Sequence, residues 1–251
     1  MSAPRNGSEV TSAGAMASER VHATPPRFSK DIVERLKRLE DLTGTIADIF
    51  DQLGLRGAIG ASRLRPTIGD ARIVGTAVTV RNVAARQDPH ISATTNNFLM
   101  AEVEGIHQAG PGDVLVIEGV PDISNMGGIV ASLAAKQGMA GAVVDGGVRD
   151  IAHSRRIGFP IWSKDISPIT GKWRCITEEV NCAVNIGDVT VYPGDLVVAD
   201  ETGVCFVPRD KVEEVVAKAE LLTQKEEDIL KRIDAGMTIP ELVAKVYPTR
   251  K

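Results

Sequence analysis

The stretch GAVVDGGVRD, residues 141–150, has the pattern of a buried strand that ends at two charged residues. Residues 142–144 form an apolar run, which is typical of a strand covered on both faces. The Asp-Gly-Gly segment 145–147 is expected to end that strand. Arg149 and Asp150 follow side by side, where an arginine can hold an anion and a carboxylate can hold a metal ion. Alternatively, the two side chains form a solvated surface pair.

The sequence before this strand favours a binding site. Residues 127–141 (GGIVASLAAKQGMAG) start with two glycines and continue as an alanine-rich pattern that predicts a helix. The first turn of a helix has free N–H groups, and Gly127 and Gly128 allow a ligand to approach the backbone. If the predicted strands at 111–119 and 142–145 are parallel, both turns open at the sheet edge where α/β proteins bind ligands. The spacing therefore predicts a site for a small carboxylate beside a divalent cation.

The patterns in the rest of the chain predict a mixed order of helices and strands. They predict two helices between Ser29 and Gly54, a strand at 73–81, a helix ending at Gly110, a strand near 159–163, two short strands within 193–208 and a charged helix over 209–235. Eight regular strand–helix units cannot be counted, which argues against a TIM barrel. We expect one layered α/β domain over residues 28–236, a disordered leader at 1–27 and a helical tail at 237–251.

Composition excludes several classes of protein. The chain has 251 residues, 43% of them hydrophobic, so it can bury a full core. Its net charge is −4 and its basic residues are scattered, which argues against a nucleic-acid partner. No apolar run is long enough to span a membrane, and the N-terminal stretch lacks the apolar core of a signal peptide. The three cysteines are irregularly spaced, which is typical of a cytoplasmic protein without disulfides or a zinc site.

Three stretches of this sequence resemble the RraA-like family. They are GGIVASLAAKQGMAGAVVDGGVRD, GFPIWSK and VYPGDLVVADETGVCFVP, and the resemblance covers about residues 30–236. The family includes class II aldolases acting on 4-hydroxy-4-methyl-2-oxoglutarate and 4-carboxy-4-hydroxy-2-oxoadipate, and also a regulator of ribonuclease activity. The resemblance implies a swivelling β/β/α-type layered domain with flanking N- and C-terminal helices.

The resemblance also implies a role for each site residue. Arg149 matches the arginine that binds the pyruvyl moiety and stabilises its enolate, and Asp150 matches a metal ligand. Backbone amides at Ile129 and Val130 match those that hold the substrate carboxylate, so Gly127 to Val130 form the expected substrate-binding turn. Glu226, or the glutamate next to it, matches an acid that reaches the metal from a neighbouring subunit. A homotrimer or a hexamer of paired trimers is therefore expected.

One position departs from the aldolase pattern. The acidic residue that binds metal-bound water in the aldolases falls at Gly128 in this chain, and Asn125 is a partial substitute that cannot take up a proton. The implied reaction is retro-aldol cleavage of a 2-oxo acid, oxaloacetate decarboxylation, or both. Each forms a pyruvate enolate, which a divalent cation stabilises as a Lewis acid. Mg²⁺ suits a site of few carboxylates, with Mn²⁺ as an alternative.

Other readings of these residues stay open at the level of sequence. Lys164 follows a predicted strand, where a Schiff-base aldolase could carry its amine. His153 is a packing residue or a substrate contact. Asp48 and Asp51 are expected on a solvated helix face, and Asp200 and its neighbour Glu201 in a turn. The alternative function is a protein without catalytic activity that binds and regulates a ribonuclease or another protein.

Overall fold

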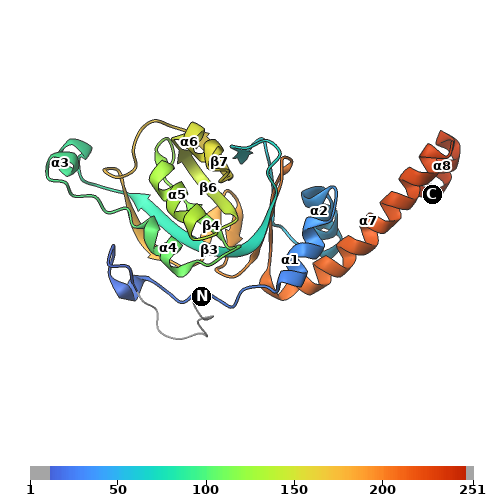
Figure 1. Ribbon diagram of the computed structural model, residues 1–251, viewed down its shortest axis with the longest axis horizontal. Helices are drawn as coiled ribbons and strands as arrows, with labels where there is room; N and C mark the ends of the chain where they lie inside the picture. The colour runs from blue at the N-terminus through green and yellow to red at the C-terminus, as the bar shows by residue number, and fades with distance from the viewer. Residues whose placement is uncertain (1–11, 247–251) are drawn as a thin grey trace.

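The computed structural model describes residues 12–246, and a ten-stranded mixed sheet forms the centre of the protein (Figure 1). In spatial order the strands are β1 (Ala58–Gly60), β12 (Gly203–Val207), β11 (Leu196–Ala199), β3 (Ile73–Ala84), β4 (Val114–Glu118), β6 (Gly141–Val148), β7 (Ile161–Ile166) and β2 (Arg65–Pro66). Two further strands are β5 (Ser124–Met126), which pairs with β6, and β8 (Cys175–Val180), which pairs with β3. A separate hairpin consists of β9 (Val184–Ile186) and β10 (Val189–Val191).

The middle of the sheet is parallel and is covered on both faces. Strands β3, β4, β6 and β7 run parallel to one another, and helices α4 (Glu102–Gln108), α5 (Gly128–Lys136) and α6 (Ile151–Arg156) cover one face. There, Leu115 and Val144 belong to the same buried cluster as Ala131 of α5. On the opposite face, Val143 and Trp162 belong to a buried cluster shared with the β9–β10 hairpin. Burial on both sides explains the continuous apolar runs of these strands.

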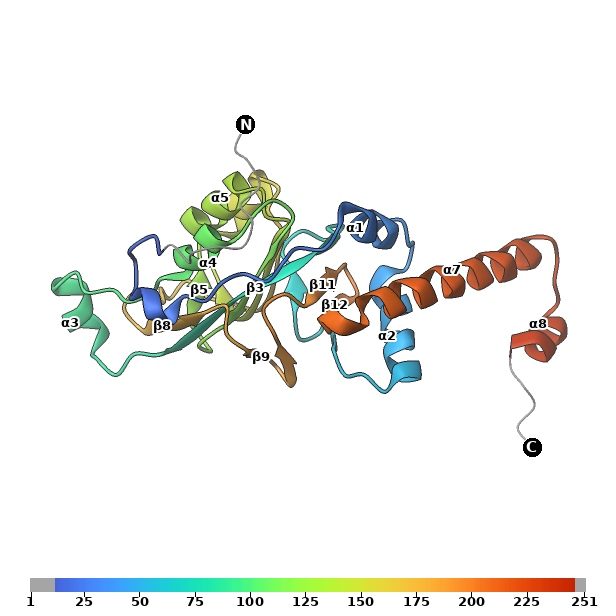
Figure 2. The ribbon, with the colours of Figure 1, turned by 90° about the horizontal axis from the view of Figure 1, so that it is seen from below.

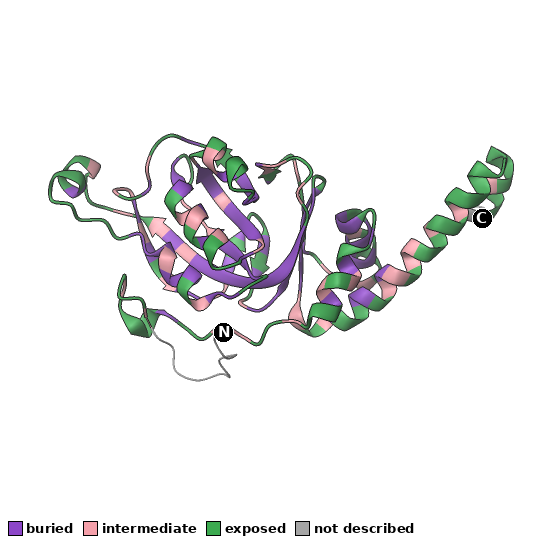
Figure 3. Cartoon of the chain, in the orientation of Figure 1, coloured by how far each residue is buried: buried purple, intermediate pink, exposed green. Residues whose placement is uncertain are grey.

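The terminal helices form another layer beyond β11 and β12. Helices α1 (Lys30–Lys37) and α2 (Leu42–Leu53) pack against the first half of α7 (Val212–Asp234), and a short helix α8 (Ile239–Val246) follows. Figures 1 and 2 show α7 extending away from the sheet. Its buried residues all lie at or before Ala219, whereas its second half is mostly exposed (Figure 3). The flanking helices therefore confirm the expected layered α/β architecture.

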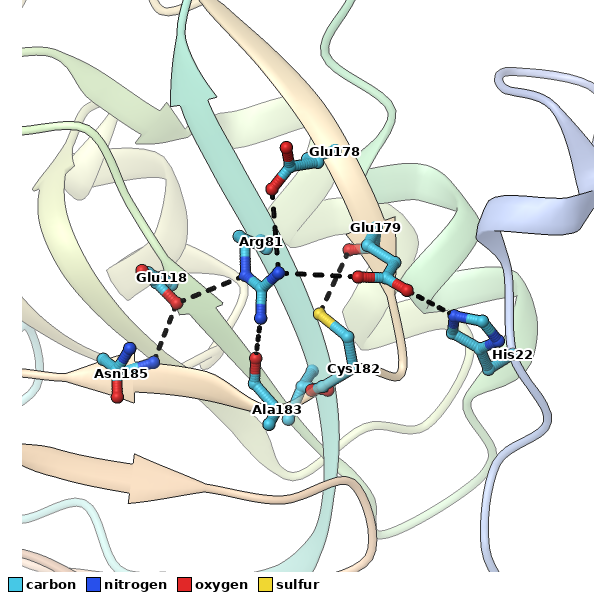
Figure 4. A network of polar contacts seen from close by, with 9 residues as sticks. His22, Arg81, Glu118, Glu178, Glu179, Cys182, Ala183 and Asn185 are labelled. Atoms are coloured by element: carbon cyan, nitrogen blue, oxygen red, sulfur yellow. Dashed lines mark hydrogen bonds and ion pairs between the residues drawn. The ribbon is translucent and has the colours of Figure 1, made fainter.

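A network centred on Arg81 joins the end of β3 to its neighbours (Figure 4). The guanidinium pairs with Glu118 at 3.7 Å and with Glu179 at 3.5 Å. The Nε2 atom of His22 lies 2.6 Å from Glu179, and this contact, together with Arg81, holds the pKa of Glu179 below its usual value. The network thereby attaches the N-terminal segment to β8.

The N-terminal segment differs from the expected disordered leader where the structure describes it. Its backbone N–H groups at Ala13 and Ala15 donate to the carboxylate of Glu104 at 2.7 and 2.6 Å. A short 3-10 helix spans Ser18–Arg20, and Val21 bridges to β8. Residues 12–27 thus pack on the domain, while residues 1–11 of the leader and 247–251 of the tail lie outside the described residues. Within the described part, no helix is long and apolar enough to cross a membrane.

The main error in the expected strands concerns β6. It does not end at residues 145–147 but continues to Val148. The glycines in this segment allow the loop at 120–125 to pack closely against β6. A Cβ on Gly147 would lie 2.6 Å from the carbonyl oxygen of Ile123, and a Cβ on Gly146 would collide with the side chain of Asn125. The short strands β1, β2, β5 and β8–β10 were not expected. The helix expected to end at Gly110 is α4, which ends at Gln108, and a separate helix α3 (Pro89–Thr94) precedes it.

Candidate active site at the start of α5

The charged pair stands where β6 passes into α6. Asp150 is the N-cap of α6 and has a left-handed backbone conformation, with φ of 58°. This conformation is unfavourable for a residue other than glycine and costs on the order of 1–3 kcal/mol. It turns the Asp150 carboxylate away from its own helix, where it makes no capping hydrogen bond. The carboxylate instead reaches α5, which starts on the neighbouring segment.

The Asp150 carboxylate is anchored by one oxygen and leaves the other free. Its Oδ2 atom accepts a hydrogen bond from the N–H of Gly128 at 2.8 Å and lies 3.7 Å from Nε of Arg149. Its Oδ1 atom has no partner among residues 12–246, and about half of the side chain is exposed (49%). A hard cation that retains most of its water can be bound by one or two carboxylates. The free oxygen is therefore of the kind that could hold a divalent cation.

The first turn of α5 offers donors beside this carboxylate. Ala131 is the first residue of α5 whose N–H donates a hydrogen bond to a preceding backbone carbonyl. The acceptor is the carbonyl oxygen of Gly127, at 3.0 Å. The N–H groups of Ile129 and Val130 form no such bond in the described part of the chain, as expected at a helix start. Ile129 is also strongly exposed. These two groups, placed at the positive end of the helix, can accept a small carboxylate.

Arg149 lies against the same turn. A Cβ on Gly127 would come within 3.1 Å of both Arg149 Nε and Asp150 Oδ2. The Nη nitrogens of Arg149 have no partner among the residues that the structure describes, and its side chain is one-third exposed (34%). The guanidinium, the Asp150 carboxylate and the α5 N–H groups thus meet at one edge of the sheet. The structure therefore brings together the residues that the sequence placed in the site, with the exception of Glu226.

Asn125 does not take the place of the missing acid. Its side chain is fully buried and forms hydrogen bonds with the N–H and the carbonyl oxygen of Val120, both at 2.9 Å. A further bond joins it to the carbonyl oxygen of Ile123 at 3.1 Å. Asn125 therefore fixes the loop between β4 and β5, and its hydrogen bonds within the described residues go to that loop and to Asn82, not to Asp150.

Two residues near the site were missed at the level of sequence. Ser132 Oγ lies 2.7 Å from Nε2 of His153, and Nδ1 of His153 lies 2.7 Å from Nη2 of Arg156. A Cβ on Gly128 would be only 3.2 Å from Cδ2 of His153, so the imidazole packs directly on the glycine. Ser132 occurs one helical turn after Gly128, and Arg156 one turn after His153. This helical spacing is the signal that could have identified them.

Glu226 lies away from Arg149 and Asp150 within one chain. It lines a cleft of about 390 Å³ between α2 and α7, together with Asp41, Asp48 and the apolar Ile229. Partial burial, and then the charges of Asp48 and Asp41, raise the pKa of Glu226. Helix α7 extends away from the part of the fold that carries α5 and α6 (Figures 1 and 2). Any contact of Glu226 with the candidate site would therefore require a second copy of the chain.

The remaining candidates lie outside this edge of the sheet. Lys164 pairs with Asp145 at 3.2 Å, and alternation along β7 places it on the same face as Trp162, opposite α5. Asp200 caps the start of α2 through hydrogen bonds from the N–H and hydroxyl of Thr43, at 3.0 and 2.6 Å. Burial would raise the pKa of Asp200, but these bonds hold it below its usual value. Glu201 and Asp51 are exposed.

The cysteines make no disulfide. Cys175 and Cys205 are buried, Cys182 is half-buried, and all three are free thiols. Burial raises the pKa of Cys175 and Cys205 to about 12, which makes both thiols poor nucleophiles. Over residues 12–246, no group of three or more His, Cys, Asp or Glu side chains could hold a metal ion within one chain. In the segments that form the candidate site, residues 127–136 and 149–156, Asp150 is the only acidic residue.

Comparison with known proteins identifies the relatives of this chain. A family model described as RraA-like, Aldolase/RraA, matches residues 43–206. A Halalkalibacterium halodurans protein named "Putative 4-hydroxy-4-methyl-2-oxoglutarate aldolase" is 33% identical over 179 residues, covering 70% of this chain and 77% of that protein. Protein DlpA of Legionella pneumophila is 28% identical over 198 residues, covering 78% of this chain. The match spans only 31% of DlpA, about a third of its length.

Solved structures show the same fold. An uncharacterized protein from Pseudomonas syringae pv. tomato aligns with a TM-score of 0.72 at 27% identity, covering 85% of this chain and 97% of that one. RraAS2 of Streptomyces coelicolor, described as an unusual member of the RNase ES inhibitor RraA protein family, aligns with a TM-score of 0.67 at 28% identity. That alignment covers 80% of this chain and 96% of the Streptomyces chain.

Proposed function

Because the chain belongs to the RraA-like family, we propose that it is a metal-dependent carbon–carbon lyase that releases pyruvate from a 2-oxo acid. The reaction is retro-aldol cleavage, decarboxylation of oxaloacetate, or both. The observation that carries this proposal is the meeting of three kinds of group at one sheet edge. They are the donors of Arg149, one oxygen of Asp150 and the N–H groups at the start of α5, all without a partner among residues 12–246.

Each of these groups has a role in the proposed reaction. The N–H groups of Ile129 and Val130 bind the substrate's 1-carboxylate, which fixes its orientation. In retro-aldol cleavage the 4-hydroxyl group gives up its proton to water, and carbon 4 leaves as the carbonyl carbon of the second product. The electron pair of the broken bond between carbons 3 and 4 moves toward the 2-oxo oxygen, and Arg149 stabilises the negative charge that develops there. A proton delivered to carbon 3 then completes pyruvate. In decarboxylation the same bond breaks and carbon dioxide leaves.

Asp150 would hold the divalent cation, most simply Mg²⁺, through the carboxylate oxygen that is free in the structure. When bound, this cation supplies Lewis-acid stabilisation of the enolate. The Gly128 N–H keeps the other oxygen of Asp150 in place, so the carboxylate is preorganised. The similarity to an aldolase-named relative supports divalent-metal dependence for this chain.

The second candidate function is regulation of a protein partner without catalysis. It is favoured by Gly128, which stands where the aldolases have an acidic residue, and by the similarity to RraAS2, whose description names an RNase inhibitor family. We favour the lyase because a regulator has no evident need for a preorganised carboxylate beside a free guanidinium and a free helix start.

Pyruvate release from a panel of 2-oxo acids tests the lyase directly. We expect release in the presence of Mg²⁺ or Mn²⁺, loss of activity with EDTA, and recovery when the metal is restored. Borohydride added together with substrate should leave the enzyme active, since Lys164 lies on the opposite face of the sheet from α5. Metal-independent turnover, or a reduced adduct on Lys164, would contradict the mechanism. No release from any substrate would favour the regulator.

We further propose that the site is completed in a homo-oligomer, a trimer or a hexamer, by Glu226 of the partner subunit. A single carboxylate, that of Asp150, binds a hard cation only weakly. Within one chain Glu226 lies in the α2–α7 cleft, so it could reach the Asp150 carboxylate only from another subunit. Beyond Ala219, α7 exposes apolar side chains, with Leu221 at 59% and Leu230 at 55% exposure, which an intersubunit contact would cover.

Mixing of two inactive variants tests this sharing of sites. Asp150→Ala and Glu226→Ala should each be inactive, and after subunit exchange their mixture should recover about a quarter of the wild-type activity, because a random closed ring pairs intact halves at that frequency. Mixing Asp150→Ala with the double variant should recover nothing. Light scattering gives the oligomeric state. A fully active monomer would contradict both proposals about assembly, whereas an oligomer without recovery would remove only Glu226.

A further inference from the structure

A cavity lies between the end of β3, strand β8 and an arm that carries α3. The arm is the segment 85–99, and Figures 1 and 2 show it extending beyond the end of β3. The volume of the cavity is about 460 Å³, which is the size of a site for a small organic ligand. Its lining includes no residue of the candidate active site at 127–136 and 149–156. The cavity is therefore a separate feature of the fold.

Backbone contacts hold the arm in place at both ends. Leu99 forms an isolated bridge with Ile176, and its carbonyl oxygen accepts a hydrogen bond from the N–H of Thr177 at 2.9 Å. At the other end of the arm, the N–H of Ala85 donates to the carbonyl oxygen of Arg174 at 2.8 Å. The arm is thus fixed to β8 and to the loop before it, and the cavity is preformed.

One side of the cavity is aromatic and apolar. Trp173 is half-buried and lines the cavity, and its ring meets that of Phe98 edge to face, with 6.0 Å between the centroids. The Nζ atom of Lys172 lies 5.5 Å from the centroid of the same indole ring. Leu99 and Ile176 add apolar side chains to the lining. Such a surface favours the packing of a flat ring.

The lining also carries positive charge that no carboxylate compensates. Arg86 and Lys172 are exposed, and the side chain of neither forms an ion pair or a hydrogen bond within residues 12–246. Glu178 is the acid in the lining, and it pairs with Arg81 at 3.7 Å. The carboxylate of Asp88, also on the arm, accepts hydrogen bonds from N–H groups at the start of α3. Both nearby acids are therefore engaged elsewhere.

We infer that this cavity binds a small aromatic carboxylate. The ring of the ligand packs against Trp173 and the apolar lining, and its carboxylate pairs with Arg86 and Lys172. Hydrogen bonds between charged groups are about twice as strong as those between neutral ones, so the charge of the ligand decides its affinity. This site is independent of the proposed function, because the lyase and the regulator could each carry it.

Binding of two ligands of the same shape tests the inference. 2-Naphthoate and 2-naphthamide share the ring system and differ in charge, and titration calorimetry should show about tenfold tighter binding of 2-naphthoate to the wild-type protein. The double variant Arg86→Gln with Lys172→Gln should abolish this preference and leave 2-naphthamide binding unchanged. Both side chains are exposed, so the fold should be retained.

A third substitution tests the aromatic part of the site. Trp173→Leu keeps an apolar side chain but removes the flat ring. It should weaken the binding of both ligands by about fivefold and retain the preference for 2-naphthoate. Unchanged affinities in this variant would show that neither ligand packs on Trp173.

Two control variants locate the bound ligand. Arg174→Gln removes a charge next to Trp173, but the Arg174 guanidinium donates to the carbonyl oxygen of Thr170 and does not line the cavity, so the preference should persist. Arg149→Gln removes a cation of the candidate active site and should leave both affinities unchanged.

Four results would overturn the inference. They are a wild-type protein that does not bind 2-naphthoate, equal affinities for the two ligands, a preference that survives in the double variant, and a preference that is lost in Arg149→Gln. The last would place the ligand in the candidate active site. Pyruvate release from 2-oxo acids is measured separately, so these results leave the proposed function standing or falling on its own test.

Discussion

Arg149→Lys is expected to lower kcat/KM for pyruvate release by roughly a hundredfold while leaving the melting temperature nearly unchanged. Lysine keeps the positive charge but loses the planar set of donors that can hold an oxyanion at two points. The Arg149 side chain makes one long contact, 3.7 Å to Asp150, and its terminal nitrogens have no partner among the described residues. Its removal therefore costs little folding energy, since exposed pairs of this kind contribute about 0–1 kcal/mol.

The loss should fall mainly on kcat if Arg149 stabilises charge that develops during bond cleavage. Steady-state kinetics on the best substrate of the panel, with thermal unfolding in parallel, give both quantities. Arg155→Lys is the matched control, because Arg155 lies on α6, the helix that follows Arg149, and its Nε donates to the carbonyl oxygen of Thr67. Full activity of Arg149→Lys would place the guanidinium outside the site. Arg149 would then not be the residue that stabilises the enolate.

Local sequence patterns were sufficient to predict those elements of the candidate site that are close together in sequence. The glycine turn, the alanine-rich helix and the apolar strand that follows it all occur within residues 127–148, and parallel pairing of β4 with β6 was the condition that brought them to one edge. The role of Gly146 and Gly147 was misjudged. Their lack of a side chain admits the loop at 120–125, and that contact is invisible in a pattern that considers only neighbouring residues.

Contacts between distant segments could not be predicted for the same reason. The hydrogen bond between Ser132 and His153 depends on how α5 and α6 pack side by side, and neither residue has an unusual local setting. The cleft around Glu226 forms between α2 and α7, which are far apart in the sequence. Asp200 was expected in a turn, but its task as the cap of α2 depends on Thr43, also distant in sequence. Residue types and periods predict elements, whereas packing decides which polar side chains meet.

Packing also sets the pKa of Glu102, and from that pKa we predict how the stability of the protein depends on pH. This residue starts α4 and is nearly fully buried, at 7% exposure, close to Cys175. Burial raises the pKa of its carboxyl from 4.5 to about 7, and a hydrogen bond from its own backbone N–H opposes that rise only in part. Burial thus favours the neutral form of the carboxyl.

The sign of the effect follows from proton binding. Between pH 4.5 and about 7 the folded protein holds a proton on Glu102 that the unfolded chain has lost, so the stability contributed by this residue decreases as pH rises through that window. Above pH 7 the full cost of a buried charge is present, about 3 kcal/mol from the difference between the two pKa values. Below pH 4.5 the carboxyl is neutral in both states and the cost disappears.

Glu102→Gln should therefore stabilise the protein at pH 8 by about 3 kcal/mol and have little effect at pH 4.5, because glutamine keeps the shape of the side chain and is neutral throughout. Urea unfolding at both pH values gives the two free energies, and other titrating groups cancel in the difference between variant and wild type. Glu201→Gln removes the same charge from an exposed position and should change stability little at either pH. An equal effect of Glu102→Gln at pH 4.5 and pH 8 would show that the carboxyl is not titrating inside the fold, and its burial would then have to be compensated by a polar partner.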